Sequence, residues 1–199
     1  MHLVGIRAIL YGYFTAQDAA VDHFEAIIRT LLEADHYWVQ SSFKVDLTSE
    51  EKRQIGKHSM PRPEIDLLAL NFAKNEVLVV EAKSFLDSPG VRLEELSEEH
   101  DIPDGRYKLF TSKRYRTIVF KRLLLQLCEH GMSRANTKIS LVLAAGKVYK
   151  DQTAALQELF LAREFVLWSP SDIKDKVTAL AKRGYENDPA IITAKILLR

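Results

Sequence analysis

The stretch from Pro63 to Lys83, PEIDLLALNFAKNEVLVVEAK, restricts the fold of this chain more than any other. It holds two short apolar runs, 65–70 and 77–80, on either side of a polar segment that contains Asn and Lys. Short apolar runs joined by such a segment are typical of a β-hairpin, and strands this apolar are expected to be buried on both faces. The sequence therefore predicts a buried hairpin at the centre of the fold.

Charged residues lie at the open end of this hairpin. A turn centred on Ala73 and Lys74 places Asp66 directly opposite Glu81. Opposed residues point to the same face with Cβ atoms about 5 Å apart, and Lys83, two residues beyond Glu81, shares that face. Carboxylates this close repel each other, and a divalent cation such as magnesium would relieve the repulsion. A simple salt bridge at a strand end is the alternative, because an E-x-K triplet is common.

Composition limits the class of protein. The chain has 199 residues with 47% hydrophobic content and a formal net charge of +1, which suits one soluble domain with a substantial core. No apolar run approaches the roughly 18 residues that span a bilayer, so no membrane partner is expected. The single cysteine, Cys128, excludes an internal disulfide and a cysteine metal cage, and agrees with a cytoplasmic location. The apolar start lacks the basic leader of a secretory signal, so residues 3–14 are predicted to form a helix of the mature fold.

Helices and strands alternate along the rest of the chain. We expect helices over 17–34, 116–130, 151–162, 171–182 and 189 to the C-terminus, a short capped helix from Thr48, and strands over 37–47, 139–145 and 164–168. Glu25 falls inside the apolar arc of the first of these helices. A carboxylate on the buried face of a helix indicates a functional role, unless Glu25 lies at the edge of the apolar stripe and its side chain reaches solvent.

A basic segment follows an acidic one after the hairpin. Residues 84–104 carry seven acidic residues and one basic residue, whereas 106–122 carry seven basic residues, interleaved with aromatic ones, and no acidic residue. This second pattern favours binding to a phosphate backbone, although a solvated surface with Phe110 and Phe120 in the core is also possible. The candidate nucleic-acid-binding residues are Arg106, Lys108, Lys113, Arg114, Arg116, Lys121 and Arg122.

The order of these features resembles the PD-(D/E)xK nuclease superfamily. A helix with Glu25, a strand, a hairpin with Asp66 and Glu81-Ala82-Lys83, a helix and a strand follow one another over about 18–145. The resemblance implies one restriction-endonuclease-like α/β domain, with a central mixed β-sheet flanked by helices and with 146–199 as helical and strand decoration. The family's first aspartate maps to Asp66, but Pro63 lies three residues before it, which leaves Glu64 as a rival ligand.

The resemblance also implies a mechanism, that of a magnesium-dependent (or manganese-dependent) endonuclease acting on DNA. Asp66, Glu81 and the main-chain carbonyl of Ala82 would hold the metal, and Glu25 would act through a water or hold a second ion. Lys83 would orient the attacking water, or take its proton if burial depressed the lysine pKa. Gln126, on the helix after the hairpin, matches the glutamine that many members use to position water or phosphate. Many relatives act as dimers, so a homodimer is possible.

Two other functions fit the same residues. One is a catalytically inactive nucleic-acid-binding or protein-interaction module on the same fold. The other is a partner protein whose acidic 94–104 and basic 106–122 segments pair with another subunit. Restriction, repair and mobile-element roles all stay open, since base readout depends on a few contacts that no motif encodes.

Overall fold

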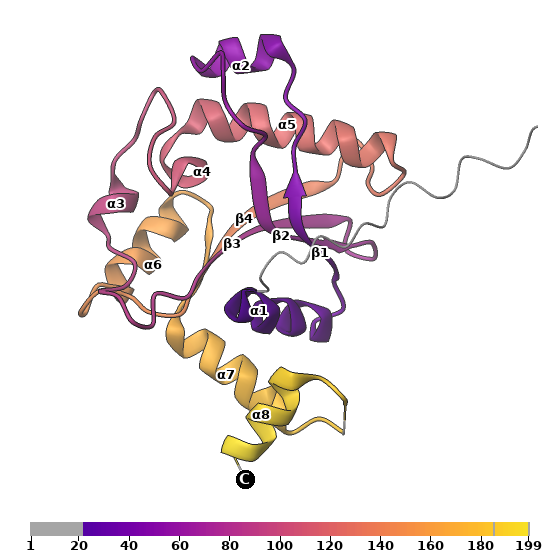
Figure 1. The fold of residues 1–199 in the computed structure, drawn as a ribbon, viewed down its shortest axis with the longest axis vertical. Coiled ribbons are helices and arrows are strands. Elements are labelled where there is room, and N and C mark those ends of the chain that lie inside the picture. Colours follow the sequence, from indigo (N-terminus) through magenta and orange to yellow (C-terminus); the bar gives the residue numbers. More distant parts are fainter. Residues whose placement is uncertain (1–21, 185, 199) are drawn as a thin grey trace, which may run out of the picture.

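The computed structural model describes residues 22–184 and 186–198, and within them the chain forms a five-stranded sheet in the order β1-β2-β3-β4-β5. The β1–β2 and β2–β3 pairs are antiparallel, whereas β3–β4 and β4–β5 are parallel. Helices lie on both faces of this sheet (Figure 1). The predicted α/β class and the mixed sheet flanked by helices are confirmed.

The elements follow the expected order, except that two short helices, α3 and α4, interrupt the segment after the hairpin, where no helix was predicted. They are α1 (His23–Ala34), β1 (Trp38–Lys44), α2 (Ser49–Ile55), β2 (Glu64–Asn71), β3 (Glu76–Lys83), α3 (Glu94–Ser97), α4 (Lys108–Thr111), α5 (Lys113–Glu129), β4 (Lys138–Ala145), α6 (Thr153–Ala162), β5 (Val166–Trp168), α7 (Pro170–Ala181) and α8 (Pro189–Leu197). The helix predicted over 3–14 and the start predicted at 17–18 lie outside the described residues. The described part of α1 begins after Asp22, whose side chain accepts hydrogen bonds from the backbone N–H groups of Phe24 and Glu25.

The hairpin has the predicted register. Leu67 pairs with Val80 and Asn71 pairs with Glu76, so the turn is centred on Ala73 and Lys74. The next opposed position along the two strands is that of Asp66 and Glu81. The spacing of the two apolar runs was therefore sufficient to predict the register.

Two apolar clusters hold the sheet between its helices. Alternate residues of β3 divide between them: Val77 and Val79 pack with α5, whereas Val80 and Ala82 pack with α1, α7 and α8. The layers are visible in Figure 1, with α2 and α5 on one side of the sheet and α1, α7 and α8 on the other. By the same alternation, Glu81 and Lys83 emerge on the side of α5.

The hairpin opens at Asp66. The β2–β3 ladder begins at Leu67, and the β1–β2 register omits the position where Ser42 faces Asp66. Ser42 has a left-handed backbone (φ 51°), and beyond it Phe43 belongs to the α5 side although Val39 belongs to the α1 side. β2 thus stays paired with β1 as far as Glu64 but leaves its ladder with β3 at Leu67, which leaves room for side chains at this end of the sheet.

The segment between β3 and α5 is packed, not simply polar. Val91, Leu96 and Phe110 are buried in the α5-side cluster, and an isolated bridge joins Val91 to Val148. Phe110 is thus a core residue, and Phe120 packs against the same cluster. The apolar residues that interrupt the two charged segments therefore anchor them to the sheet.

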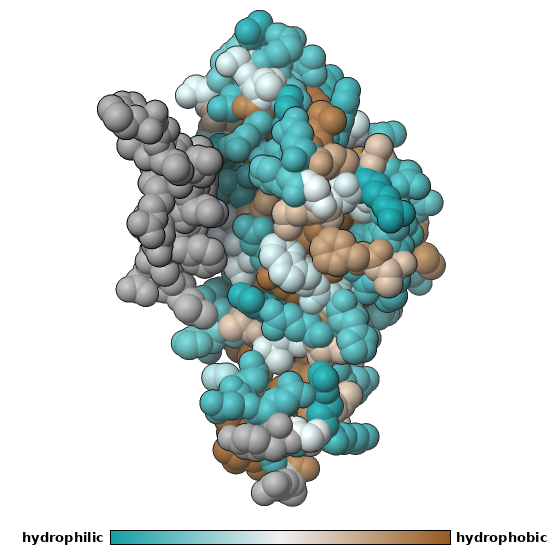
Figure 2. Space-filling view, turned by 90° about the vertical axis from the view of Figure 1, so that its right-hand side faces the viewer, coloured by the Kyte–Doolittle hydropathy of each residue, from teal (hydrophilic) through white to brown (hydrophobic). Residues whose placement is uncertain are grey.

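The outer surface is mainly hydrophilic on the side that Figure 2 presents, with apolar residues in small patches. At the lower end of that view, the apolar colour marks α8, where Ile196 and Leu197 are 70% and 73% exposed. None of the helices in the described ranges is long and apolar enough to cross a membrane.

Candidate active site

Three of the predicted site residues meet at the open end of the hairpin. The Lys83 Nζ lies 2.9 Å from the Asp66 Oδ2 and 3.3 Å from the Glu81 Oε2. Their side chains are only 20%, 21% and 12% exposed, respectively. A short ion-paired cluster has therefore formed in a mostly buried position, as the hairpin register predicted.

Asp66 also stabilises the opened strand. Its Oδ2 accepts a hydrogen bond of 2.9 Å from the Ala82 backbone N–H. The ladder partner that this N–H would find on a continuous β2 is missing, because β2 has already diverged. One carboxylate oxygen thus replaces a ladder bond and contacts the lysine at the same time.

Burial and charge change the pKa of Glu81. Burial raises it most, the negative charge of Asp66 raises it further, and Lys83 and Lys108 only partly offset this, so the pKa rises from 4.5 to about 7. Burial raises the pKa of the Tyr107 and Tyr115 phenols, and the charge of Glu81 raises both further, so the two buried rings lie within electrostatic range of this carboxylate. Ionised Glu81 is therefore costly in the protein alone, and a nearby cation would stabilise it.

The pKa of Lys83 is raised, whereas a lysine that acts as a general base needs a lowered pKa. Burial alone would lower its pKa, but Glu81 and Asp66 together outweigh this effect and raise it above the usual value. Lys83 thus remains an ammonium group at neutral pH. Of the two roles considered for Lys83, taking a proton would need a depressed pKa, whereas its two carboxylate partners raise the pKa of this lysine.

Glu25 approaches from the other side of the sheet. It lies in the first turn of α1, and its pKa is raised by burial first and then by Asp66, while Lys83 lowers it. It is therefore within electrostatic reach of the cluster. Among residues 22–184 and 186–198, however, no three His, Cys, Asp or Glu side chains converge closely enough to hold a metal ion. The present side-chain positions thus bring together two carboxylates and a lysine, with Glu25 near them.

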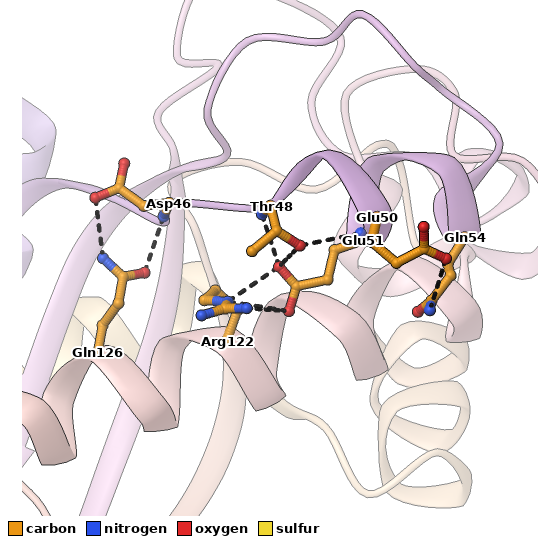
Figure 3. Close-up of polar contacts among 7 residues, drawn as sticks. All are labelled: Asp46, Thr48, Glu50, Glu51, Gln54, Arg122 and Gln126. Atoms are coloured by element: carbon orange, nitrogen blue, oxygen red, sulfur yellow. Dashed lines mark hydrogen bonds and ion pairs between the residues drawn. The ribbon is translucent and has the colours of Figure 1, made fainter.

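Gln126 has a different set of partners. Its Oε1 accepts a hydrogen bond of 2.9 Å from the Asp46 backbone N–H, and its Nε2 donates to the Asp46 Oδ2 at 3.3 Å. Figure 3 shows both contacts beside the ion pair between Arg122 of α5 and Glu51 of α2. No hydrogen bond joins Gln126 to Asp66, Glu81 or Lys83 in the described part of the chain. Gln126 therefore joins α5 to the segment after β1 through two hydrogen bonds.

We expect Gln126→Leu to lower the free energy of unfolding by about 1–3 kcal/mol, because it leaves the Asp46 N–H without its acceptor in a half-buried position. Chemical denaturation followed by circular dichroism measures this. Gln54→Leu is the matched control, since that glutamine makes only an exposed contact with Glu50. An unchanged free energy of unfolding together with lost catalysis would instead give Gln126 a direct role at the active site.

The seven basic candidates divide into two groups. Arg116 donates to the Leu109 and Phe110 carbonyls, and Arg122 pairs with Glu51 at 2.8 Å, so both are engaged inside the fold. The other five lie further out: Lys108 is close enough for its charge to act on Glu81, and Arg106, Lys113, Arg114 and Lys121 are exposed. Glu64, the rival ligand, is also on the surface, 3.9 Å from Lys44.

The pKa shift of Glu81 predicts how stability depends on pH. Because the folded protein binds the Glu81 proton more tightly than the unfolded chain does, metal-free stability should fall as pH rises from about 4.5 to 7. The expected loss is about 1–3 kcal/mol, since one pKa unit corresponds to about 1.4 kcal/mol. Urea titrations in EDTA across this range measure the slope, and Glu81→Gln should flatten it. An equal slope in both proteins would contradict the assignment.

Comparisons with known proteins leave the family open. No protein-family model and no curated protein matches the chain. A solved structure described as a crystal structure of a protein of unknown function, AF1548, is similar over 86% of this chain, with 12% sequence identity and a TM-score of 0.33. The match covers 64% of the length of that protein.

Proposed function

We propose that the protein is a metal-dependent nuclease of the PD-(D/E)xK type that hydrolyses phosphodiester bonds in DNA. The observation that carries this proposal is the contact of one lysine with two buried carboxylates, Asp66 and Glu81, at the open end of the hairpin. The sequence of elements supports it: α1, β1, the β2–β3 hairpin, α5 and β4 follow in the order of a restriction-endonuclease-like core.

The donor set fits magnesium or manganese. Magnesium is usually held by one or two carboxylates and keeps several waters, so Asp66 and Glu81 are sufficient as side-chain ligands. The Ala82 carbonyl would be the third donor. It points to the same edge of β3 as the Ala82 N–H, toward the space that β2 leaves when it diverges. Glu25 would act through a bound water. When bound, the metal supplies Lewis-acid stabilisation of the scissile phosphate.

Lys83 would act as a fixed positive charge. Since Asp66 and Glu81 keep it protonated, it can donate a hydrogen bond to the attacking water or to a phosphate oxygen, and it offsets negative charge in the transition state. Asp66 fixes its position, because the same oxygen contacts both Nζ and the Ala82 backbone. With Lys83 protonated, a carboxylate or solvent would accept the proton of the attacking water.

A second function is favoured by one observation. The described side chains do not form a group of three metal-binding residues, which would suit a catalytically inactive DNA-binding or protein-interaction module on the same fold. In that case Lys83 would be a permanent replacement for the cation. The two functions differ in a single measurable property, which is metal-dependent cutting.

Nicking of supercoiled plasmid DNA separates them. We expect nicked product with Mg²⁺ or Mn²⁺, none with Ca²⁺ or EDTA, and none with Glu81→Ala in any metal. DNA binding without nicking in every metal would favour the inactive module. An absence of both would favour a protein partner for the charged segments.

A further inference from the structure

Two loops continue β3, which carries Glu81 and Lys83, and its parallel neighbour β4. Residues 84–92 follow β3 directly after Lys83, and residues 146–152 follow β4. The loops are joined by the Val91–Val148 bridge, by hydrogen bonds from Val91 N to Lys147 O (3.0 Å) and from Tyr149 N to Val91 O (2.9 Å), and by Leu93 N to the Gln152 side chain (2.9 Å). They therefore form one fixed surface beside the active site.

Stacked cations and aromatic rings cover this surface. The Arg106 guanidinium lies 5.5 Å from the Phe85 ring centroid, and the Arg92 guanidinium lies 4.5 Å from that of Tyr149. The Lys150 Nζ is a second cation over Tyr149, at 4.9 Å. We call Phe85, Arg92, Arg106, Lys147, Tyr149 and Lys150 the loop platform. A guanidinium stacked on a ring is a planar surface on which a base can stack.

Backbone strain coincides with these stacks. Phe85 and Lys150 both have left-handed backbones, each with φ 46°. A left-handed backbone is unfavourable for a non-glycine residue, and such residues persist where the surrounding structure fixes them, often at functional sites. Phe85 lies in the first loop and supplies the ring under Arg106, and Lys150 lies in the second loop and supplies a cation over Tyr149. Two of the residues that form the cation–ring pairs, Phe85 and Lys150, are therefore held in a strained backbone conformation.

The charge of the platform complements that of the active site. Asp66, Glu81 and Glu25 repel a phosphate, so a nucleic acid needs cations around them to approach. Arg106, Lys147 and Lys150 form no ion pair with a carboxylate of the described chain, and Arg92 pairs only with the exposed Glu94, at 3.0 Å. The exposed Asp87, Glu94, Glu95 and Asp151 bring the local charges close to balance, so the cations available to a phosphate are the three without a carboxylate partner. Phe85 is two residues from Lys83, a reach of at most about 7 Å.

We infer that the loop platform binds a DNA strand with unpaired bases and leads it to the active site. This inference rests on the proposed nuclease function, which it makes more specific in its substrate. Bases in a duplex are stacked on one another and offer no free face, whereas an unpaired strand can stack on the Arg92–Tyr149 and Arg106–Phe85 layers. The cations contact the phosphates of the same strand.

Fluorescence polarisation in EDTA tests the inference without any cutting. We expect a labelled 20-nucleotide single strand to bind at least about tenfold more tightly than the blunt duplex of the same sequence. Arg92→Ala with Lys150→Ala should weaken single-strand binding about tenfold or more. The matched control removes two exposed lysines elsewhere, Lys138→Ala with Lys182→Ala, and should change it less than threefold.

Arg92→Lys separates stacking from charge. It keeps the positive charge and removes the planar group, so single-strand binding should still fall by at least threefold. Equal losses in the platform and control variants, equal binding of single strand and duplex, or competition by polyglutamate as strong as by DNA would each overturn the inference. A protein that nicks plasmid DNA yet fails these tests would retain the proposed function and lose only the loop platform.

Discussion

Replacing Lys83 with methionine should reduce magnesium-dependent nicking about 10³-fold, the loss typical of removing one group that stabilises transition-state charge. Methionine keeps most of the length of the side chain and removes the ammonium group that contacts Asp66 and Glu81. The two carboxylates then face each other without compensation. Initial rates of nicking on supercoiled plasmid measure the effect.

The same substitution should also lower the free energy of unfolding in EDTA by about 1–3 kcal/mol, because it leaves mostly buried carboxylates unpaired. Magnesium should restore part of this loss, because a cation held by Asp66 and Glu81 would compensate their charge. Lys44→Met is the matched control: its ion pair with Glu64 is 3.9 Å long and about half exposed, so neither rate nor stability should change appreciably. Nicking by Lys83→Met at the wild-type rate would disprove the proposed role.

Gly146→Ala should disturb the active site from a position that carries no functional group. A Cβ at this residue would lie 2.5 Å from the Ser84 carbonyl oxygen and 3.1 Å from the Phe24 ring. The first of these neighbours is backbone, and the Gly146 N–H also donates to the Lys83 carbonyl at 2.9 Å. Because neither strand end can move independently, the ends of β3 and β4 must separate. We expect a loss of about 1–3 kcal/mol in the free energy of unfolding.

Activity should fall as well, because β3 carries Glu81 and Lys83 and because Phe24 precedes Glu25. Thermal unfolding and plasmid nicking are the two measurements. Gly184→Ala is the matched control, since a Cβ there meets nothing within 4 Å. Equal melting temperatures for Gly146→Ala and wild type would show that the strand ends are looser than their contacts indicate.

The hairpin illustrates how much local sequence could predict. Its strands, turn and register follow from apolar runs of a definite length on either side of a polar segment, because strand pairing across a short turn involves neighbours in the chain. The meeting of Asp66, Glu81 and Lys83 follows from that register alone. The helix caps were equally predictable: Thr48 and Glu51 form the capping box of α2, and Asp188 caps α8.

Contacts between residues that are distant in the sequence could not be predicted from such local patterns. Gln126 and Asp46 are 80 residues apart, and Arg122 and Glu51 are 71 apart. The basic segment looked uniform in sequence, yet Arg116 and Arg122 have partners within the fold whereas Lys113 and Lys121 are exposed. Gly146-Lys147 resembles the end of a phosphate-binding loop but lacks its other residues, so neither Lys147 nor Lys150 was predicted to bind nucleic acid. The interleaving of lysines with Tyr149 directly after a buried strand was the signal that could have drawn attention to them.

The sequence by itself determined the strands and the longer helices, the hairpin register and the residues at its open end, because these depend on periodicity and on neighbours along the chain. Only the tertiary structure decided the charge state of Lys83, the partners of Gln126 and Arg122, and the joining of the two loops beside the site. Those properties depend on burial and on which side chains meet across the sheet, and neither quantity is encoded in the spacing of residues along one segment.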